Sequence, residues 1–186
     1  METWDAMRSR RNVRQFTDQP VSDDALDRIL EAGRRAPSAG NWQPWDFVLV
    51  TDGAQLGELS KVWRGAGHVA RAAAAIAIVA PEPKDAQQAA LLHYDLGQAT
   101  YAMMVAAADL GVGTGHAAVA DQEQAKRVLG FPEGRFLAYV LSAGYPADKP
   151  LTVIKRLDRR PFDEVVHRGT WNAASSDAAA EPADRA

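Results

Sequence analysis

The sequence contains no cysteine, which excludes disulfide bonds, a catalytic thiolate and metal sites that depend on cysteine. It also lacks a long apolar run: the most apolar stretch, residues 72–80, is too short to cross a bilayer as a helix. The first residues, Met1 to Asp5, include acids and show no apolar core of a signal peptide. We therefore expect a cytoplasmic protein.

An excess of positive charge is also missing, because the formal net charge is -3 at pH 7. This balance argues against general binding of polyanions and makes a nucleic-acid module the least favoured interpretation. The four histidines show no metal-binding spacing, and the chain has neither an HExxH motif nor a Gly-x-Ser-x-Gly motif. A zinc protease and a serine hydrolase of the common type are thus excluded.

What is present favours a folded domain. The chain has 186 residues, of which 47% are hydrophobic and 24% charged, a composition typical of one globular domain. From residue 172 onward the sequence is rich in alanine, serine and acids and has too little apolar surface to fold alone. We predict a single domain over residues 1–171 and a disordered tail over 172–186.

The hydrophobic patterns predict helices and strands without a strict alternation, which favours an α+β fold. Helices are expected over residues 23–35, 54–63, 85–110 and 121–130, and strands over 47–51, 75–79 and 136–143. Ser22 is a suitable N-cap for the first helix. The helix 85–110 is apolar around most of its circumference, so we expect it to be buried. The glycines at 111–115 are interpreted as the stop of that helix, and residues 147–170 as irregular and basic.

Two segments that flank the first predicted helix carry the chemistry. The earlier one, Arg10-Arg11-Asn12-Val13-Arg14-Gln15-Phe16, offers cations that suit a phosphate group. The later one runs from Ala36 to Trp45 and contains Pro37, Ser38, Asn41 and Gln43. Its amide side chains offer both donors and acceptors, which suits the edge of a flat heterocycle.

Together these two segments resemble the flavin-binding elements of the nitroreductase family, and the resemblance covers about residues 4–170. It implies a nitroreductase-like fold, with a central mixed sheet covered by helices and an intertwined homodimer. It also implies flavin mononucleotide (FMN) as cofactor and NAD(P)H as reductant. The expected reaction is ping-pong hydride transfer to an electron-poor acceptor such as a nitroaromatic or a quinone. Because flavin N5 carries the chemistry, we predict no catalytic side chain.

The resemblance also assigns residues to parts of the cofactor. Arg10, with Arg11 and Asn12 beside it, is expected at the phosphate, and Arg14 at the pyrimidine end of the ring. Serine is usual in the family where this chain has Asn12. A second cation for the phosphate is expected from Arg159, with Arg160 as the alternative.

Other predicted contacts surround the flavin ring. Ala117 and Ala118 are expected to lie beside it, and the turn is expected to reach it from the partner subunit through Pro37, Ser38, Ala39, Asn41 and Gln43. A basic residue near flavin N1 and O2 could be Arg64, His68 or Arg71, and the sequence does not choose among them.

The alternatives left open concern the activity. A non-catalytic flavin-binding or storage protein is the second interpretation, and NADH, NADPH and a deazaflavin all remain candidate reductants. We expect a small-molecule acceptor as the partner, with no nucleic acid and no membrane.

Overall fold

The computed structural model describes residues 1–156 and 158–171, so the tail expected over 172–186 lies outside the described residues. The chain forms two compact units, Met1–Val153 and a second unit that begins at Ile154. The second unit thus begins inside the range 1–171 that the sequence predicts as one domain.

Helices and strands of the first unit follow one another in a mixed order that confirms the α+β class. The α-helices are α1 (Thr3–Ser9), α2 (Asp23–Arg34), α3 (Gly53–Leu59), α4 (Ala86–Asp109) and α5 (Gln122–Leu129). Short 3-10 helices are η1 (Ala39–Asn41), η2 (Ser60–Val62) and η3 (Gly67–Arg71). The strands are β1 (Asp46–Val50), β2 (Ala74–Pro81), β3 (Gly113–Ala117) and β4 (Arg135–Gly144).

Side-chain caps determine where the helices begin. Ser22 accepts a hydrogen bond from the backbone N–H of Ala25, as the sequence predicts, with two aspartates in the first turn of α2. Asp85 caps α4 in the same way and Asp121 caps α5. Asp52 caps α3 as well. The predicted bounds of α2, α4 and α5 agree with the structure to within about two residues, whereas α3, expected to end at 63, ends at Leu59.

The four strands form one antiparallel sheet in the order β1-β2-β4-β3. The register of β2 with β4 shifts between Ile78 and Val79, which pair with Tyr139 and Leu137. Ala138 is the extra residue of a β-bulge. The expected sheet was mixed; these four strands are antiparallel, and a parallel bridge joins Asn12 to Thr114 beside them.

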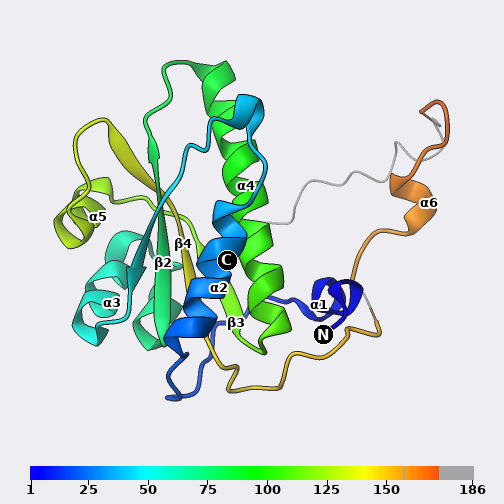
Figure 1. Cartoon of the computed structure of the whole chain (residues 1–186), viewed down its shortest axis with the longest axis horizontal. Coiled ribbons are helices and arrows are strands. Elements are labelled where there is room, and N and C mark those ends of the chain that lie inside the picture. The colour runs from blue at the N-terminus through cyan, green and yellow to red at the C-terminus, as the bar shows by residue number, and fades with distance from the viewer. Residues whose placement is uncertain (157, 172–186) are drawn as a thin grey trace. The chain divides into compact units, whose positions relative to one another are not determined.

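Both faces of the sheet are covered, which explains why β2 is apolar at every position (Figure 1). Ile76 and Ile78 belong to the core beneath α2 and α4. Ala75, Ala77 and Val79 point the other way, into the core beneath α3 and α5. Because successive strand residues face opposite sides, a strand between two helical layers needs no polar face.

Within one chain the long helix α4 is not buried all round, and the sequence predicts a buried helix whose cover one subunit alone need not supply. One face packs on the sheet through Leu92, Leu96 and Met103, which are fully buried. The opposite face exposes Tyr94 at 68% and Tyr101 at 41% of their surface. An apolar sequence pattern does not reveal whether the cover comes from the same chain or from a partner.

The glycine-rich stretch after α4 corrects a second prediction. Gly111 adopts a positive φ of 73° and ends the helix, as expected. The helix signal therefore ends at Gly111. The following residues, Gly113–Ala117, were predicted to belong to the helix stop but form the edge strand β3. The helix α1 was also missed, because its seven residues show too little periodicity to be recognised.

Up to residue 171, the described part of the second unit contains one short helix, α6 (Phe162–Val165), where the sequence predicted irregular structure. Arg160 lies 3.4 Å from the carboxylate of Glu164 within this unit. Among the described residues, no helix is long and apolar enough to cross a membrane.

Candidate functional site

The basic segment lies extended along the free edge of β3. Asn12 forms a parallel bridge with Thr114, and the N–H of Val13 donates to the carbonyl of Thr114 at 2.8 Å. Phe16 forms a second bridge, antiparallel, with Pro146. The segment is therefore held by backbone hydrogen bonds along the sheet.

Gly115 allows this close approach. A Cβ atom at that position would lie 2.4 Å from the backbone carbonyl oxygen of Val13. Any side chain there would push the segment off the sheet edge. The glycines of β3, which obscured the strand in the sequence, are thus required by the packing of the segment that carries Arg14.

The three arginines of the segment differ in their surroundings. Arg10 is half-buried, and its guanidinium carbon lies 5.9 Å from the ring centroid of Tyr101, a cation–π distance. Arg11 donates to the carboxylate of Asp148 and to the carbonyl of Lys149, both at 2.7 Å, and lowers the pKa of Asp148. Arg14 is exposed. Within the described residues, neither Arg10 nor Arg14 has a carboxylate at ion-pair distance.

The positive charges of Arg10 and Arg14 affect the pKa values of two histidines. Desolvation lowers the pKa of His116, and Arg14 and Arg10 lower it further. Desolvation also lowers the pKa of His68, with smaller contributions from Arg14 and His116. Arg10, Arg14, His68 and His116 are called the basic cluster below. Its positive charge lacks an internal counter-ion among the described residues and favours an anionic ligand.

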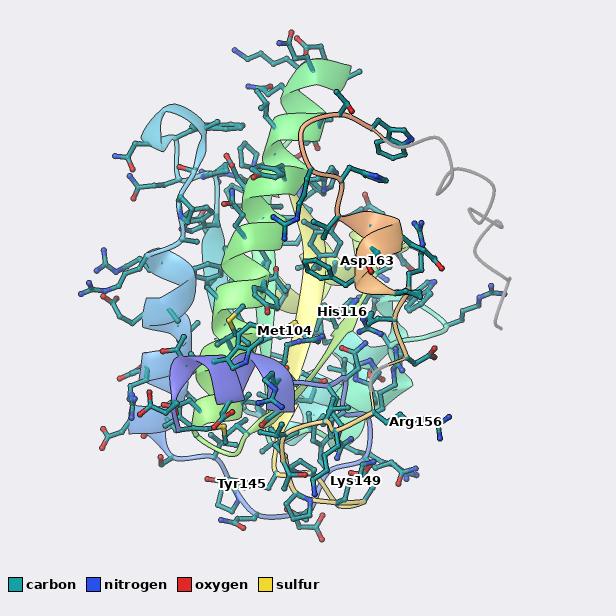
Figure 2. All side chains as sticks on the ribbon, turned by 90° about the vertical axis from the view of Figure 1, so that its right-hand side faces the viewer. Met104, His116, Tyr145, Lys149, Arg156 and Asp163 are labelled. Atoms are coloured by element: carbon teal, nitrogen blue, oxygen red, sulfur yellow. The ribbon has the colours of Figure 1, made fainter. Side chains whose placement is uncertain are left out.

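A pocket of about 320 Å³ opens between α4 and β3 at the basic cluster. Figure 2 shows Met104 of α4 and His116 of β3 on the same face of the molecule. The pocket is lined by Arg10, Gly97, Thr100, Tyr101, Met104, His116 and Tyr139. Aromatic walls with a cation at the rim suit a flat, negatively charged molecule.

The turn from Pro37 to Gln43 has an unusual backbone. Asn41 and Gln43 both have positive φ, at 57° and 52°, and Gly40 between α2 and β1 does as well. Side chains disfavour this region, at a cost of about 1–2 kcal/mol per residue. The hydroxyl of Ser38 accepts the N–H of Gln43 at 2.9 Å, and the side chain of Gln43 donates to the carbonyl of Asn41. Such strain, held by local hydrogen bonds, is common at binding sites.

Asp95 connects this turn to α4. Its carboxylate is 1% exposed and accepts the N–H of Ala39 at 3.0 Å. Its other contact is a longer one to the amide of Gln98, at 3.4 Å. No cation of the described chain lies within ion-pair distance of it. A buried carboxylate is costly, so its hydrogen bond to the turn identifies Asp95 as a structural anchor.

The turn and the basic cluster lie at different places along α4. Ala39 and Trp42 border a pocket with Leu91, near the start of the helix. Arg10 lies at Tyr101, which is ten residues further and therefore roughly 15 Å along the axis. In Figure 1 the chain between α2 and β1 lies beside the beginning of α4, whereas α1 lies beside its end. One chain does not bring the two predicted halves of the site together.

The remaining predicted residues have varied positions. Ala117 is buried in the core beneath α3 and α5, whereas Ala118 is exposed just after β3. Arg159 and Arg160 belong to the second unit, so their role at a phosphate stays a prediction. Of the three candidates near the second strand, Arg64 and Arg71 are exposed and His68 is buried.

Sequence comparison now identifies the family. A model described as the nitroreductase family matches residues 7–81, which include both predicted segments. A protein from Archaeoglobus fulgidus, provisionally named NADH dehydrogenase/NAD(P)H nitroreductase, is 32% identical over 167 residues, covering 88% of this chain and 95% of its own. The chain belongs to the nitroreductase family.

Other members of the family extend this result. The FMN reductase [NAD(P)H] of Bacillus subtilis is 24% identical over 185 residues, covering 89% of this chain and 73% of its own. A solved structure from Clostridium acetobutylicum, provisionally named NADH oxidase, has a TM-score of 0.77 at 25% identity and covers 90% of this chain and 100% of its own. The expected nitroreductase-like fold is therefore confirmed, and the chain is an oxidoreductase of nitroreductase type.

Sequence reasoning missed several residues of this nitroreductase-family site. Asp95, Tyr101 and Tyr139 lie on elements whose apolar neighbours dominate the pattern. The one readable signal was Asp95, an aspartate in the middle of a mostly apolar helix. In the described part of the chain no group of three or more His, Asp or Glu side chains could hold a metal ion.

Proposed function

We propose that this chain is an FMN-dependent oxidoreductase that takes electrons from NAD(P)H and passes them to a small electron-poor acceptor, such as a nitroaromatic or a quinone. Family membership supports the class of reaction, and the Bacillus subtilis relative is named an FMN reductase that uses NAD(P)H. The identity of the acceptor and the order of the two half-reactions belong to the proposal.

The observation that carries the proposal is the basic cluster, whose cations are unpaired among the described residues. A flavin phosphate is a dianion and needs a cation, which Arg10 supplies, and Arg14 adds a second positive charge four residues along the same segment. The ring needs polar partners at its edge, and the Nε2 atom of His68 is buried without a hydrogen-bond partner. The residues present therefore fit FMN.

Each part of the chain has a distinct task in this proposal. Arg10 holds the phosphate, and Arg14 places positive charge near the pyrimidine end of the ring. Bound FMN would supply the hydride-accepting chemistry, which the protein orients and shields from water. The neighbouring pocket offers aromatic walls to a flat substrate. The chain needs no acidic side chain of its own for these tasks.

We further propose a homodimer in which the turn of one protomer completes the site of the other. The turn and the basic cluster are separated along α4, yet both carry the polar groups that a flavin requires. Apolar side chains lie exposed on the elements near them: Trp4 of α1 is exposed at 65%, Leu91 of α4 at 44% and Tyr94 at 68%. Exposed aromatic and aliphatic groups of this kind are typical of a subunit interface.

The first experiment identifies the cofactor and the reductant. The purified protein should be yellow and should release FMN on denaturation. Anaerobic NADH or NADPH should bleach the flavin within seconds, and a panel of nitroaromatics and quinones should restore the colour. A flavin that neither nicotinamide reduces would favour the storage interpretation or a deazaflavin reductant. A colourless protein that cannot be reconstituted with FMN would refute the proposal.

The second experiment tests the shared site with mixed dimers. One variant carries Arg10→Ala; the other carries Asn41→Gly with Gln43→Gly, which removes both amides and relieves the positive-φ strain. Each variant alone should be inactive. Co-expressed subunits should regain about a quarter of the wild-type sites. Random pairing makes about half of the dimers mixed, and each mixed twofold dimer contains one intact site out of two. If the turn instead completes the site of its own chain, co-expression of the two variants restores no activity.

A further inference from the structure

The buried histidine of the basic cluster has one ring nitrogen bonded and one unused. His68 belongs to η3 and is only 8% exposed. Its Nδ1 atom lies 2.9 Å from the hydroxyl of Ser142, on the central strand β4. Its Nε2 atom is shielded from solvent and has no hydrogen-bond partner in the described chain. Buried nitrogens without a partner are rare in native proteins and call for an explanation.

The neighbours of His68 determine which nitrogen carries the proton. The hydroxyl of Ser142 donates its single proton to the carbonyl of Gly115, at 2.9 Å. It can therefore only accept from His68, so Nδ1 must carry hydrogen. Desolvation lowers the pKa of this imidazole, and Arg14 and His116 act in the same direction. The ring is thus neutral at pH 7, and Nε2 is a bare hydrogen-bond acceptor.

We propose that Nε2 of His68 accepts a hydrogen bond from the N3–H group of the flavin ring, a proposal that rests on the proposed function. The pyrimidine edge of a flavin presents this N–H between two carbonyl oxygens. Such an edge requires one acceptor flanked by donors. His68 supplies the acceptor, and Arg14, which directly follows the Val13 backbone packed at Gly115 beside His68, supplies a donor.

This assignment changes the role that the sequence suggested. A basic residue at 64, 68 or 71 was expected to donate to flavin N1 or O2. Arg64 and Arg71 are exposed, whereas His68 is fixed as an acceptor by Ser142 and Gly115. Access to Nε2 requires a neighbouring side chain to move.

The test compares FMN with 3-methyl-FMN, which lacks the N3–H donor. Apoprotein is titrated with each flavin, and the quenching of flavin fluorescence gives the Kd. Wild-type protein should bind the methylated flavin about tenfold or more weakly, as expected when a buried acceptor loses its donor. His68→Leu should bind FMN about tenfold more weakly than the wild type and should no longer distinguish the two flavins. His68→Gln, which keeps an acceptor, should retain part of the preference. Glu123→Leu, at an exposed position of α5, should retain all of it.

Each outcome separates this proposal from the proposed function. If FMN itself does not bind, the proposed function fails. If FMN binds but His68→Leu still distinguishes the two flavins, the methyl group clashes elsewhere and only the His68 assignment is wrong. Nitrogen-15 NMR of the apoprotein gives an independent readout should His68→Leu fail to fold. Protonated Nδ1 and bare Nε2 support the proposal, whereas a proton on Nε2, or a hydrogen bond from Arg14 to it in the FMN complex, overturns it.

Discussion

Substituting Gly115 by alanine is expected to detach the basic segment from the edge of β3. The new Cβ would lie 2.4 Å from the carbonyl oxygen of Val13 and 3.3 Å from the hydroxyl of Ser142. The obstacle at Val13 is backbone, which cannot change rotamer. An ordinary contact needs at least 3.4 Å, so the segment must retreat by about 1 Å.

The expected cost combines two effects. Overpacking in a tight site costs about 1–3 kcal/mol. Retreat of the segment also weakens the hydrogen bond from Val13 to Thr114, which contributes about 0.5–1.5 kcal/mol. We therefore expect Gly115→Ala to lower the free energy of unfolding by about 2–4 kcal/mol. Because Arg14 belongs to the displaced segment, FMN affinity should fall as well.

Urea unfolding of the apoprotein measures the stability, and fluorescence titration measures the FMN affinity. Gly57→Ala in α3 is the matched control, since nothing lies within 4 Å of a Cβ at that position. It should stabilise the protein by about 0.5–1 kcal/mol, because alanine favours the helix over glycine. If Gly115→Ala is as stable as the wild type and keeps the bridge between Asn12 and Thr114, our account of the β3 glycines is wrong.

Three further predictions concern the charged groups. Arg10→Ala should weaken FMN binding by about 1.5–3 kcal/mol, the contribution of a hydrogen bond to a charged group, whereas Arg8→Ala in the exposed pair with Asp5 should leave the Kd unchanged. Asp95→Ala leaves the N–H of Ala39 unpaired and should destabilise the protein by about 1–3 kcal/mol. Hydrogen exchange of residues 38–43 should then accelerate more than that of β2, and uniform acceleration would contradict an anchoring role. The depressed pKa values of His68 and His116 mean that the unfolded chain binds protons first, so stability should fall as pH drops from about 6.5 toward the folded-state pKa values. Urea unfolding at several pH values checks this, and a variant without His68 should show a shallower slope.

Much of the fold could be predicted because the decisive signals are local. Ser22, Asp85 and Asp121 lie immediately before apolar periodic runs, and each caps a helix. The strand 75–79 is a continuous apolar run, which is the signature of a strand buried on both faces. These patterns require no knowledge of distant residues.

The errors arise where a distant contact determines the structure. β3 contains glycines that would weaken an isolated strand. They are needed because Val13, which lies about a hundred residues earlier in the chain, packs against them with its side chain at Gly113 and its backbone at Gly115. The exposure of Tyr94 and Tyr101 depends on what the same chain supplies as cover. The functional segments were found from residue type alone. The roles of His68 and Asp95 depend on partners at Ser142 and Ala39, which only a three-dimensional structure connects.

The strand order has a consequence for the synthesis of this chain. β2 ends at Pro81, whereas its neighbour β4 begins only at Arg135, after α4, β3 and α5 have been made. A nascent chain that has not yet reached β4 leaves one long edge of an apolar strand without a pairing partner. Unpaired strands of this kind associate readily with one another, so we expect the chain to be most prone to aggregation before β4 has been made.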